Sequence, residues 1–161
     1  MPESLDHLNL SVRTPDGVAY GSVVTAAPPR RGIPKHARSV SGMAMTAIFT
    51  LMYQLSRREH RQYPYPRPTE AVVKEIEAEL GFPLDGGTND GVVPTLSQIY
   101  GDLILPVVAD HLDVTGQFWT EGESRTSDWL PSGSEFDEAR FERVWSSIAD
   151  YVQKAMPEAR E

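Results

Sequence analysis

The chain has 161 residues, of which 40% are hydrophobic and 24% are charged, a balance typical of a single globular domain. Its formal net charge of -8 at pH 7 argues against nucleic acid as the partner, because binding to phosphates needs a basic surface. The absence of cysteine excludes disulfide bonds, Cys-ligated zinc, iron–sulfur clusters and thiol catalysis.

No segment of the sequence has the features of an export signal or of a membrane span. The N-terminus has neither a basic n-region nor an apolar h-region, so no signal peptide is predicted. The longest apolar stretch, residues 43–55, has 13 residues and is interrupted by threonine and glutamine. A membrane-spanning helix needs about 20 apolar residues, so we expect no membrane span.

The first half of the chain predicts one strand and two helices. Val18–Thr25 follows a Pro-Asp-Gly turn and has the β-branched and aromatic content of a buried strand. Gly42–Arg61 has apolar residues at four-residue spacing, with Ser41 as its candidate N-cap. Because its first three turns are apolar almost all round, we expect this helix either to be buried or to form a lid that presents apolar surface to a substrate. Thr69 is placed to cap a shorter helix, Glu70–Leu80.

The second half predicts two helices around a second strand. Leu96–Ile104 is a candidate helix, and the apolar run Leu105–Ala109 is typical of a buried strand. Phe136–Ala155 carries apolar residues along one face and has Ser134 as its candidate cap, which predicts a terminal amphipathic helix. These elements indicate an α/β fold.

Two residues of segment 88–118 have the types and the setting of a catalytic acid–base pair. Asp90 lies in a Gly-flanked turn, and His111 comes directly after the second predicted strand. Loops that leave strand ends are where α/β folds place catalytic groups. A carboxylate that hydrogen-bonds an imidazole fixes its tautomer and stabilises its charged form, as a base that deprotonates serine requires. Both residues lie in the acidic half of the chain, since residues 81–161 carry 15 Asp and Glu against 5 Lys and Arg.

Two motifs surround these residues, N-D-G-V-V-P at positions 89–94 and D-H-L-D at positions 110–113. Together with G-V-A-Y-G-S-V-V-T at positions 17–25, they resemble the C-terminal part of bacterial triacylglycerol lipases and related esterases of the α/β-hydrolase superfamily. The resemblance implies that Asp90 is the triad acid and His111 the triad base, in the chain order serine, acid, histidine.

The same resemblance implies a partial α/β-hydrolase fold. Residues 1–161 would supply the C-terminal strands of the sheet with their flanking helices, and the half that carries the nucleophile would be absent. Within this portion, residues 30–83 would be a helical, lid-like insertion. The substrate would be an ester or a lipid.

A structural calcium ion is a further implication of the resemblance, because a carboxylate two residues after the triad histidine binds calcium in these lipases. Asp113 occupies that position, and the backbone carbonyl of Gln117 is a further candidate ligand. Calcium takes about six to eight oxygen ligands, and no second aspartate ligand is evident in the sequence. The alternative role of Asp113 is that of a loop-capping carboxylate.

The sequence contains no G-x-S-x-G nucleophile elbow. The nearest approach is S-V-S-G-M at residues 39–43, where Met43 stands in place of a small residue and a Gly- and Pro-broken basic loop, not a strand, precedes the serine. Ser41 is therefore better interpreted as a helix cap than as a nucleophile.

These observations lead to three hypotheses about function, which belong to different classes. In the first, the chain is a lipase- or esterase-like portion that supplies Asp90 and His111 and hydrolyses esters only with a nucleophile-bearing half. In the second, it is a non-catalytic binding or interaction module derived from an α/β hydrolase, with an exposed edge strand or apolar face that self-association covers. A third keeps catalysis within this chain through Ser41, which a fluorophosphonate probe would then label.

Overall fold

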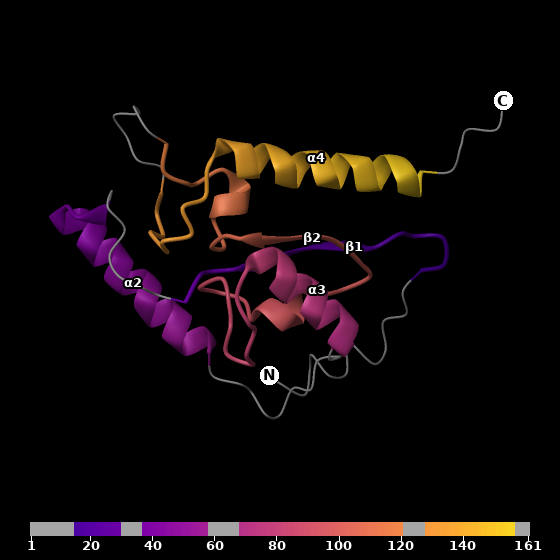
Figure 1. The fold of residues 1–161 in the computed structure, drawn as a ribbon. Coiled ribbons are helices and arrows are strands. Elements are labelled where there is room, and N and C mark those ends of the chain that lie inside the picture. Colours follow the sequence, from indigo (N-terminus) through magenta and orange to yellow (C-terminus); the bar gives the residue numbers. More distant parts are fainter. Residues whose placement is uncertain (1–14, 30–36, 58–67, 121–127, 157–161) are drawn as a thin grey trace.

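The computed structural model describes residues 15–29, 37–57, 68–120 and 128–156. Two parallel strands, β1 (Gly21–Ala26) and β2 (Asp102–Val108), pair to form its sheet. The helix α3 (Glu70–Leu80) packs on one face of this sheet and the helix α4 (Glu138–Ala155) on the other, as Figure 1 shows. The described part of the chain is therefore a mixed α/β arrangement with a helix on each face of the sheet.

The strands contribute apolar side chains to a separate hydrophobic cluster on each face. The cluster on the α4 face has as its buried members Leu105, Val107, Ala109, Phe118, Phe136 and Val144. The cluster on the α3 face has as its buried members Val24, Ala26, Ile76 and Leu80. Burial of these side chains stabilises the fold by about 25 cal/mol for each Å² of apolar surface removed from water.

The two strands are not paired residue for residue along their whole length. Ser22 lies opposite Leu103, but Val23 lies opposite Leu105, so β2 has one extra residue, Ile104. Ile104 packs against the α4 cluster together with Leu105. The second predicted strand is confirmed, although it begins at Asp102 and not at Leu105.

The predicted helix Leu96–Ile104 is wrong. Only a short 3-10 helix, η2 (Thr95–Gln98), forms there, and the last residues of the predicted helix already belong to β2. Gly101 separates the two elements with a φ of 74°, and a Cβ at this position would lie 2.1 Å from the carbonyl oxygen of Tyr20. The chain therefore turns at a residue that only glycine can occupy without strain, and the helix cannot continue through it.

Helix α3 confirms the predicted bounds at both ends. The Thr69 side chain accepts a hydrogen bond from the backbone N–H of Val72, and Gly81 ends the helix in the left-handed conformation with a φ of 77°. Both signals are local, since each acts within one turn of the helix end.

The other two helices begin at different caps from those predicted. Helix α2 (Val40–Ser56) is capped by Ser39, which accepts from the N–H of Gly42, and not by Ser41. Helix α4 is capped by Asp137 and not by Ser134. In both cases several capping residues lie close together in the sequence, and Ser134 instead hydrogen-bonds a buried carboxylate.

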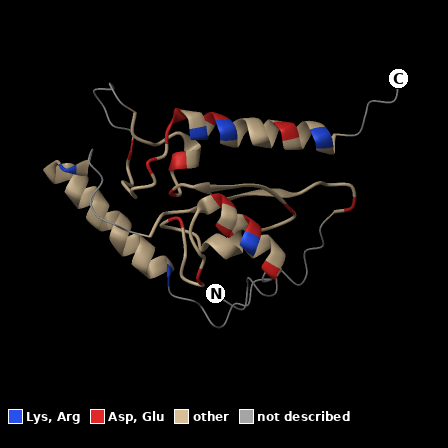
Figure 2. Cartoon of the chain, viewed as in Figure 1, with Lys and Arg blue, Asp and Glu red and all other residues tan. Residues whose placement is uncertain are grey.

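Helix α2 lies beside the carboxyl ends of the two strands (Figure 1) and is mostly exposed. Only Thr46 and Phe49 are buried, whereas Val40 is 83% and Leu51 is 61% exposed. The alternative of a buried helix is therefore wrong. Residues 40–56 contain no charged side chain, and Figure 2 shows this uncharged helix beside more highly charged elements. None of the helices in the described ranges is long and apolar enough to cross a membrane.

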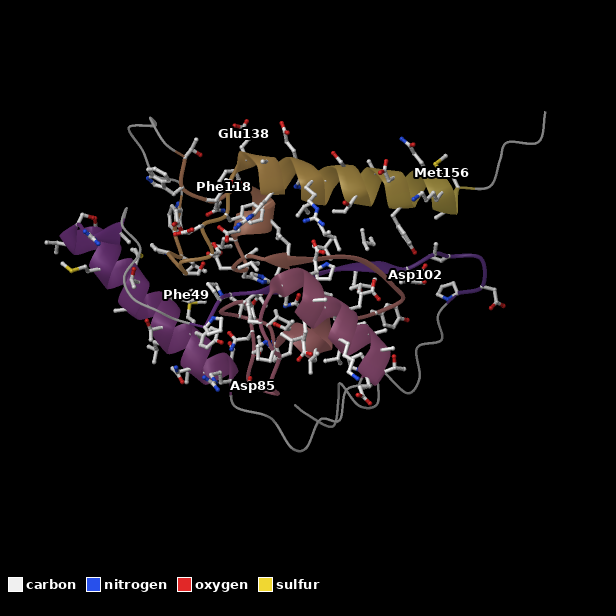
Figure 3. All side chains as sticks on the ribbon, viewed as in Figure 1. Phe49, Asp85, Asp102, Phe118, Glu138 and Met156 are labelled. Carbon is white, nitrogen blue, oxygen red and sulfur yellow. The ribbon has the colours of Figure 1, made fainter. Side chains whose placement is uncertain are left out.

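The single buried aromatic side chain of α2 packs against the rest of the described chain. Phe49 extends from α2 toward the body of the molecule (Figure 3), where it packs with Ala27 and Leu130. Near the other end of the helix, the Ser56 hydroxyl donates to the carbonyl oxygens of Gly91 and Val92 at 3.2 and 3.0 Å. These contacts bring α2 against the turn that follows Asp90.

Candidate active site

The parallel direction of the strands brings two distant loops together at their carboxyl ends. The backbone N–H of Ala27, directly after β1, donates to the carbonyl of Asn89 at 3.0 Å. The backbone N–H of His111, just after β2, donates to the carbonyl of Asp90 at 3.0 Å. The loop that carries Asp90 is thus held beside the ends of both strands.

Asp90 lies at the centre of a dense set of hydrogen-bond donors. Its side chain is 2% exposed, and its Oδ1 accepts from the backbone N–H groups of Val92 at 2.9 Å and Val93 at 2.7 Å. Its Oδ2 lies 2.8 Å from the hydroxyl of Thr25 and 3.3 Å from Nε2 of Gln98. These donors satisfy both oxygens of the buried carboxyl group and fix its orientation.

The third partner of Asp90 Oδ2 is the histidine that the sequence predicts as the triad base. His111 Nδ1 lies 3.0 Å from Asp90 Oδ2, while the imidazole side chain is 44% exposed. A proton on Nδ1 that is donated to the carboxylate leaves Nε2 with a free lone pair. Within the described ranges, Nε2 of His111 has no hydrogen-bond partner, so this nitrogen is available as a base, and the side chain borders an accessible space.

That space is a hollow of about 400 Å³ on the α4 side of the sheet. Asp90 and His111 lie in its wall together with Thr25 and Gln98. Thr115 and six apolar side chains line the remainder, the latter being Val23, Val93, Val114, Val144, Trp145 and Ile148. An acid–base pair at the edge of an apolar hollow is an arrangement that ligand and active sites share.

Ser41 does not share this hollow. It lies in a separate hollow of about 240 Å³ with Trp129 and Pro131, and its Oγ is 3.2 Å from the hydroxyl of Ser39. Within the described residues, no serine hydroxyl hydrogen-bonds His111. The structure therefore brings together the predicted acid and base but places no described serine with them.

A third predicted site residue, Asp113, belongs to a buried hydrogen-bonded network that includes Asp110, the residue before His111. Its Oδ2 accepts from the backbone N–H of Asp110 at 2.8 Å and from the hydroxyl of Ser134 at 2.7 Å. Asp110 in turn accepts from the backbone N–H of Leu112 at 2.9 Å and from the hydroxyl of Ser132 at 2.8 Å. Two serines from one later segment thus hold the turn that contains His111.

Burial of these two carboxyl groups changes their ionisation. Loss of hydration raises the pKa of Asp110 to about 6, against the hydrogen bond from Ser132. Loss of hydration and the neighbouring charge of Asp110 raise the pKa of Asp113 to about 8. Asp113 keeps its proton after Asp110 has lost its own, because two adjacent buried carboxylates would repel each other.

The described groups around Asp113 do not by themselves form a calcium site. Its Oδ2 is already engaged by two hydrogen-bond donors, and the backbone N–H of Gln117 donates to the carbonyl of Leu112. In the parts of the chain that the structure describes, no group of three or more His, Asp or Glu side chains is placed to hold a metal ion. Calcium at Asp113 and Gln117 stays a prediction of the resemblance.

The sequence motifs did not identify the residues that support the acid and the histidine turn. Thr25 of β1 and Gln98 of η2 contact Asp90. Ser132 contacts Asp110 and Ser134 contacts Asp113, and both serines come later in the chain. The two serines stand in an S-x-S pattern, which by itself predicts no partner. The carboxylates that they contact are 21 to 22 positions away in the chain.

Comparisons with models of protein families, with curated proteins and with solved structures found no match to this chain. What bears on function is therefore the geometry of Asp90 and His111.

Proposed function

We propose that this chain is a portion of a lipase- or esterase-like serine hydrolase with a partial α/β-hydrolase fold. It supplies Asp90 as the acid and His111 as the base, and a serine nucleophile comes from another polypeptide segment. The observation that carries the proposal is the 3.0 Å contact between a buried carboxylate and an imidazole whose other nitrogen is free, at the carboxyl ends of two parallel strands. The substrate class is an ester or a lipid.

The reaction follows from the roles that these groups can take. His111 Nε2 removes the proton of the serine hydroxyl as its oxygen attacks the ester carbonyl, and Asp90 stabilises the imidazolium that forms. The imidazolium then gives its proton to the leaving alcohol, which yields an acyl-serine. His111 next removes a proton from water as the water attacks the acyl-serine. The imidazolium then returns this proton to the serine oxygen as the bond between that oxygen and the acyl group breaks, which releases the carboxylic acid and restores both residues.

The apolar hollow beside His111 is the space in which serine and substrate meet. Trp145 and Ile148 of α4 contribute apolar surface to it, and Thr25, Gln98 and Asp90 lie on its polar side. Within this proposal, α2 is the lid-like part of the insertion predicted over residues 30–83, whereas α3 of the same range packs on the sheet. The contacts of α2 with Gly91 and Val92 support that assignment, because they place an exposed apolar helix next to the acid turn.

Complementation tests the proposal. The chain is purified together with a polypeptide that carries a G-x-S-x-G elbow and its strand from a lipase-like hydrolase, and hydrolysis of p-nitrophenyl butyrate is followed. We expect hydrolysis from the mixture and none from either part alone. Asp90→Ala and His111→Ala should abolish it, whereas the exposed-helix control Asp150→Asn should leave it unchanged. Hydrolysis that is indifferent to the first two substitutions would overturn the proposal.

A second candidate function, a non-catalytic interaction module, is favoured by the exposed apolar surface of α2. Val40 and Leu51 project into solvent on a helix without charge, and exposed apolar patches often mark interaction surfaces. A stable dimer in size-exclusion chromatography with light scattering, together with failure of complementation, would favour this alternative. Labelling of the isolated chain at Ser41 by a fluorophosphonate would contradict both functions, because it would place the nucleophile within this chain.

A further inference from the structure

The backbone N–H and carbonyl of Thr25 in β1 are hydrogen-bonded by side chains. Its N–H donates to Oε1 of Gln98 at 2.7 Å, and its carbonyl accepts from Nε2 of Gln98 at 3.1 Å. The hydroxyl of Thr95 donates to the same carbonyl at 3.0 Å. Since a carboxamide carries an acceptor and a donor side by side, as a peptide group does, Gln98 takes the place of a neighbouring strand at this point.

The carboxamide of Gln98 also reaches the candidate triad acid. Its Nε2 lies 3.3 Å from Oδ2 of Asp90. The hydroxyl of Thr25 lies 2.8 Å from Oδ2 of Asp90 and 3.0 Å from Oε1 of Gln98. A hydroxyl has one proton, and the shorter contact is to the charged acceptor, so Thr25 donates to Asp90.

These contacts converge on one oxygen atom. Oδ2 of Asp90 accepts hydrogen bonds from the hydroxyl of Thr25 and from Nε2 of Gln98. The same oxygen faces Nδ1 of His111. Thr25 and Asp90 are both buried, so removal of the carboxamide would leave a backbone N–H without its acceptor in a place where such a loss is costly. The orientation of the carboxylate thus depends on Gln98 both directly and through Thr25.

We infer that Gln98 is a positioning residue for the Asp90–His111 pair, because its carboxamide closes the outer edge of β1 at Thr25 and holds Oδ2 of Asp90 toward Nδ1 of His111. The catalytic meaning of this role rests on the proposed function. The geometry itself can be tested on the isolated full chain, which needs no hydrolysis as a readout.

The test compares Gln98→Met with Ser97→Ala. Methionine has a similar length without hydrogen-bonding groups, whereas Ser97 lies on the same 3-10 helix and its hydroxyl donates to the carbonyl of Pro94. Hydrogen–deuterium exchange of the Thr25 amide and the ¹⁵N shifts of the His111 ring are measured by NMR. In Gln98→Met we expect Thr25 to exchange at least about tenfold faster and the His111 ring to shift toward a mixture of tautomers. Ser97→Ala should match the wild type in both.

Global stability is measured in parallel by urea denaturation. Unchanged Thr25 exchange, or an unchanged His111 ring spectrum, in a folded Gln98→Met variant would overturn the inference. If Gln98→Met does not fold, the inference is tested on the wild-type chain. A hydrogen bond from the Thr25 N–H to Gln98 gives a scalar coupling between the Thr25 ¹⁵N and the side-chain ¹³Cδ of Gln98. Absence of this coupling would overturn the inference, and its presence supports it.

The outcome for Gln98 is separable from the outcome for the proposed function. If Thr25 and His111 respond as expected but no elbow-bearing polypeptide restores hydrolysis, Gln98 positions a pair without catalytic use and only the proposed function fails. If complementation succeeds and Gln98→Met leaves the His111 ring unchanged, only the role of Gln98 fails.

Discussion

Asp90 and His111 are joined twice, once through the backbone and once through their side chains. The N–H of His111 donates to the carbonyl of Asp90 at 3.0 Å, and His111 Nδ1 lies 3.0 Å from Asp90 Oδ2. The carboxylate cannot rotate without breaking its bonds to the N–H groups of Val92 and Val93. The imidazole is therefore oriented by an acid that is itself fixed, which a pair on two mobile loops would not achieve.

Removal of the Asp90 carboxylate should destabilise the chain even when no substrate is present. In Asp90→Ala, buried donors from the backbone and from Thr25 lose their acceptor, and each such loss costs about 1–3 kcal/mol. We expect the free energy of unfolding to fall by about 2–4 kcal/mol, measured by urea denaturation followed by circular dichroism. The exposed Asp150→Asn variant should stay within about 0.5 kcal/mol of the wild type. Equal midpoints for Asp90→Ala and the wild type would show that this turn is not held as described.

The raised pKa of Asp113 predicts how the stability of the chain changes with pH. The unfolded chain releases the Asp113 proton near pH 3.8, whereas the folded chain holds it up to about pH 8. The folded state therefore loses relative stability as pH rises across this window. Asp113→Asn has no proton to release and keeps an acceptor for Asp110 and Ser134. Its urea midpoint should exceed that of the wild type at about pH 8, with a difference that shrinks toward about pH 4.

The same measurement, repeated with calcium and with a chelator, tests the calcium prediction. If Asp113 and Gln117 hold calcium, the wild-type midpoint should fall on chelation, and Asp113→Asn should be the less stable protein in calcium at about pH 8. If the hydrogen-bonded network alone holds the turn, chelation should leave the midpoint in place. A variant that is less stable at about pH 8 without any effect of calcium would contradict both expectations.

Elements with signals at their own ends were predictable from the sequence. Helix α3 has Thr69 at one end and Gly81 at the other, and the structure gives the same bounds. The stretch Leu96–Ile104 had helical spacing of apolar residues, but pairing with β1 takes its last residues into a strand. Tertiary contacts thus decided the element where local spacing was ambiguous.

The candidate site was predictable to the extent that its residues lie in motifs. Asp90 and His111 were identified by the motifs around them, and the structure places them together. Gln98, Ser132 and Ser134 are ordinary polar residues in the sequence. Their roles depend on which carboxylate lies opposite them after folding, and no local pattern carries that information.

Phe49 should be the most sensitive apolar residue of α2. It is 2% exposed and packs with Ala27 and Leu130, whereas Leu51 on the same helix is 61% exposed. Because truncation of a buried Phe leaves a cavity, Phe49→Ala should lower the free energy of unfolding by about 3–4 kcal/mol. Leu51→Ala should change it by no more than about 0.5 kcal/mol. Urea denaturation of both variants gives the comparison, and equal effects would mean that α2 is not anchored through Phe49.

Gly101 should tolerate no side chain, because its φ is positive and because a Cβ would clash with the backbone of Tyr20. Gly17 shares only the positive φ, so it separates the two effects. Gly101 and Gly17 both have positive φ values, 74° and 81°, so Gly→Ala brings similar backbone strain at each, about 1–2 kcal/mol. A Cβ on Gly101 would also lie 2.1 Å from the carbonyl oxygen of Tyr20, the acceptor for the N–H of Asp102 at the start of β2, whereas nothing lies within 4 Å of a Cβ on Gly17. We therefore expect Gly101→Ala to destabilise the chain by at least about 2 kcal/mol more than Gly17→Ala, in urea denaturation of the two variants. Equal losses would mean that strain alone acts at Gly101, and that β2 does not start against Tyr20.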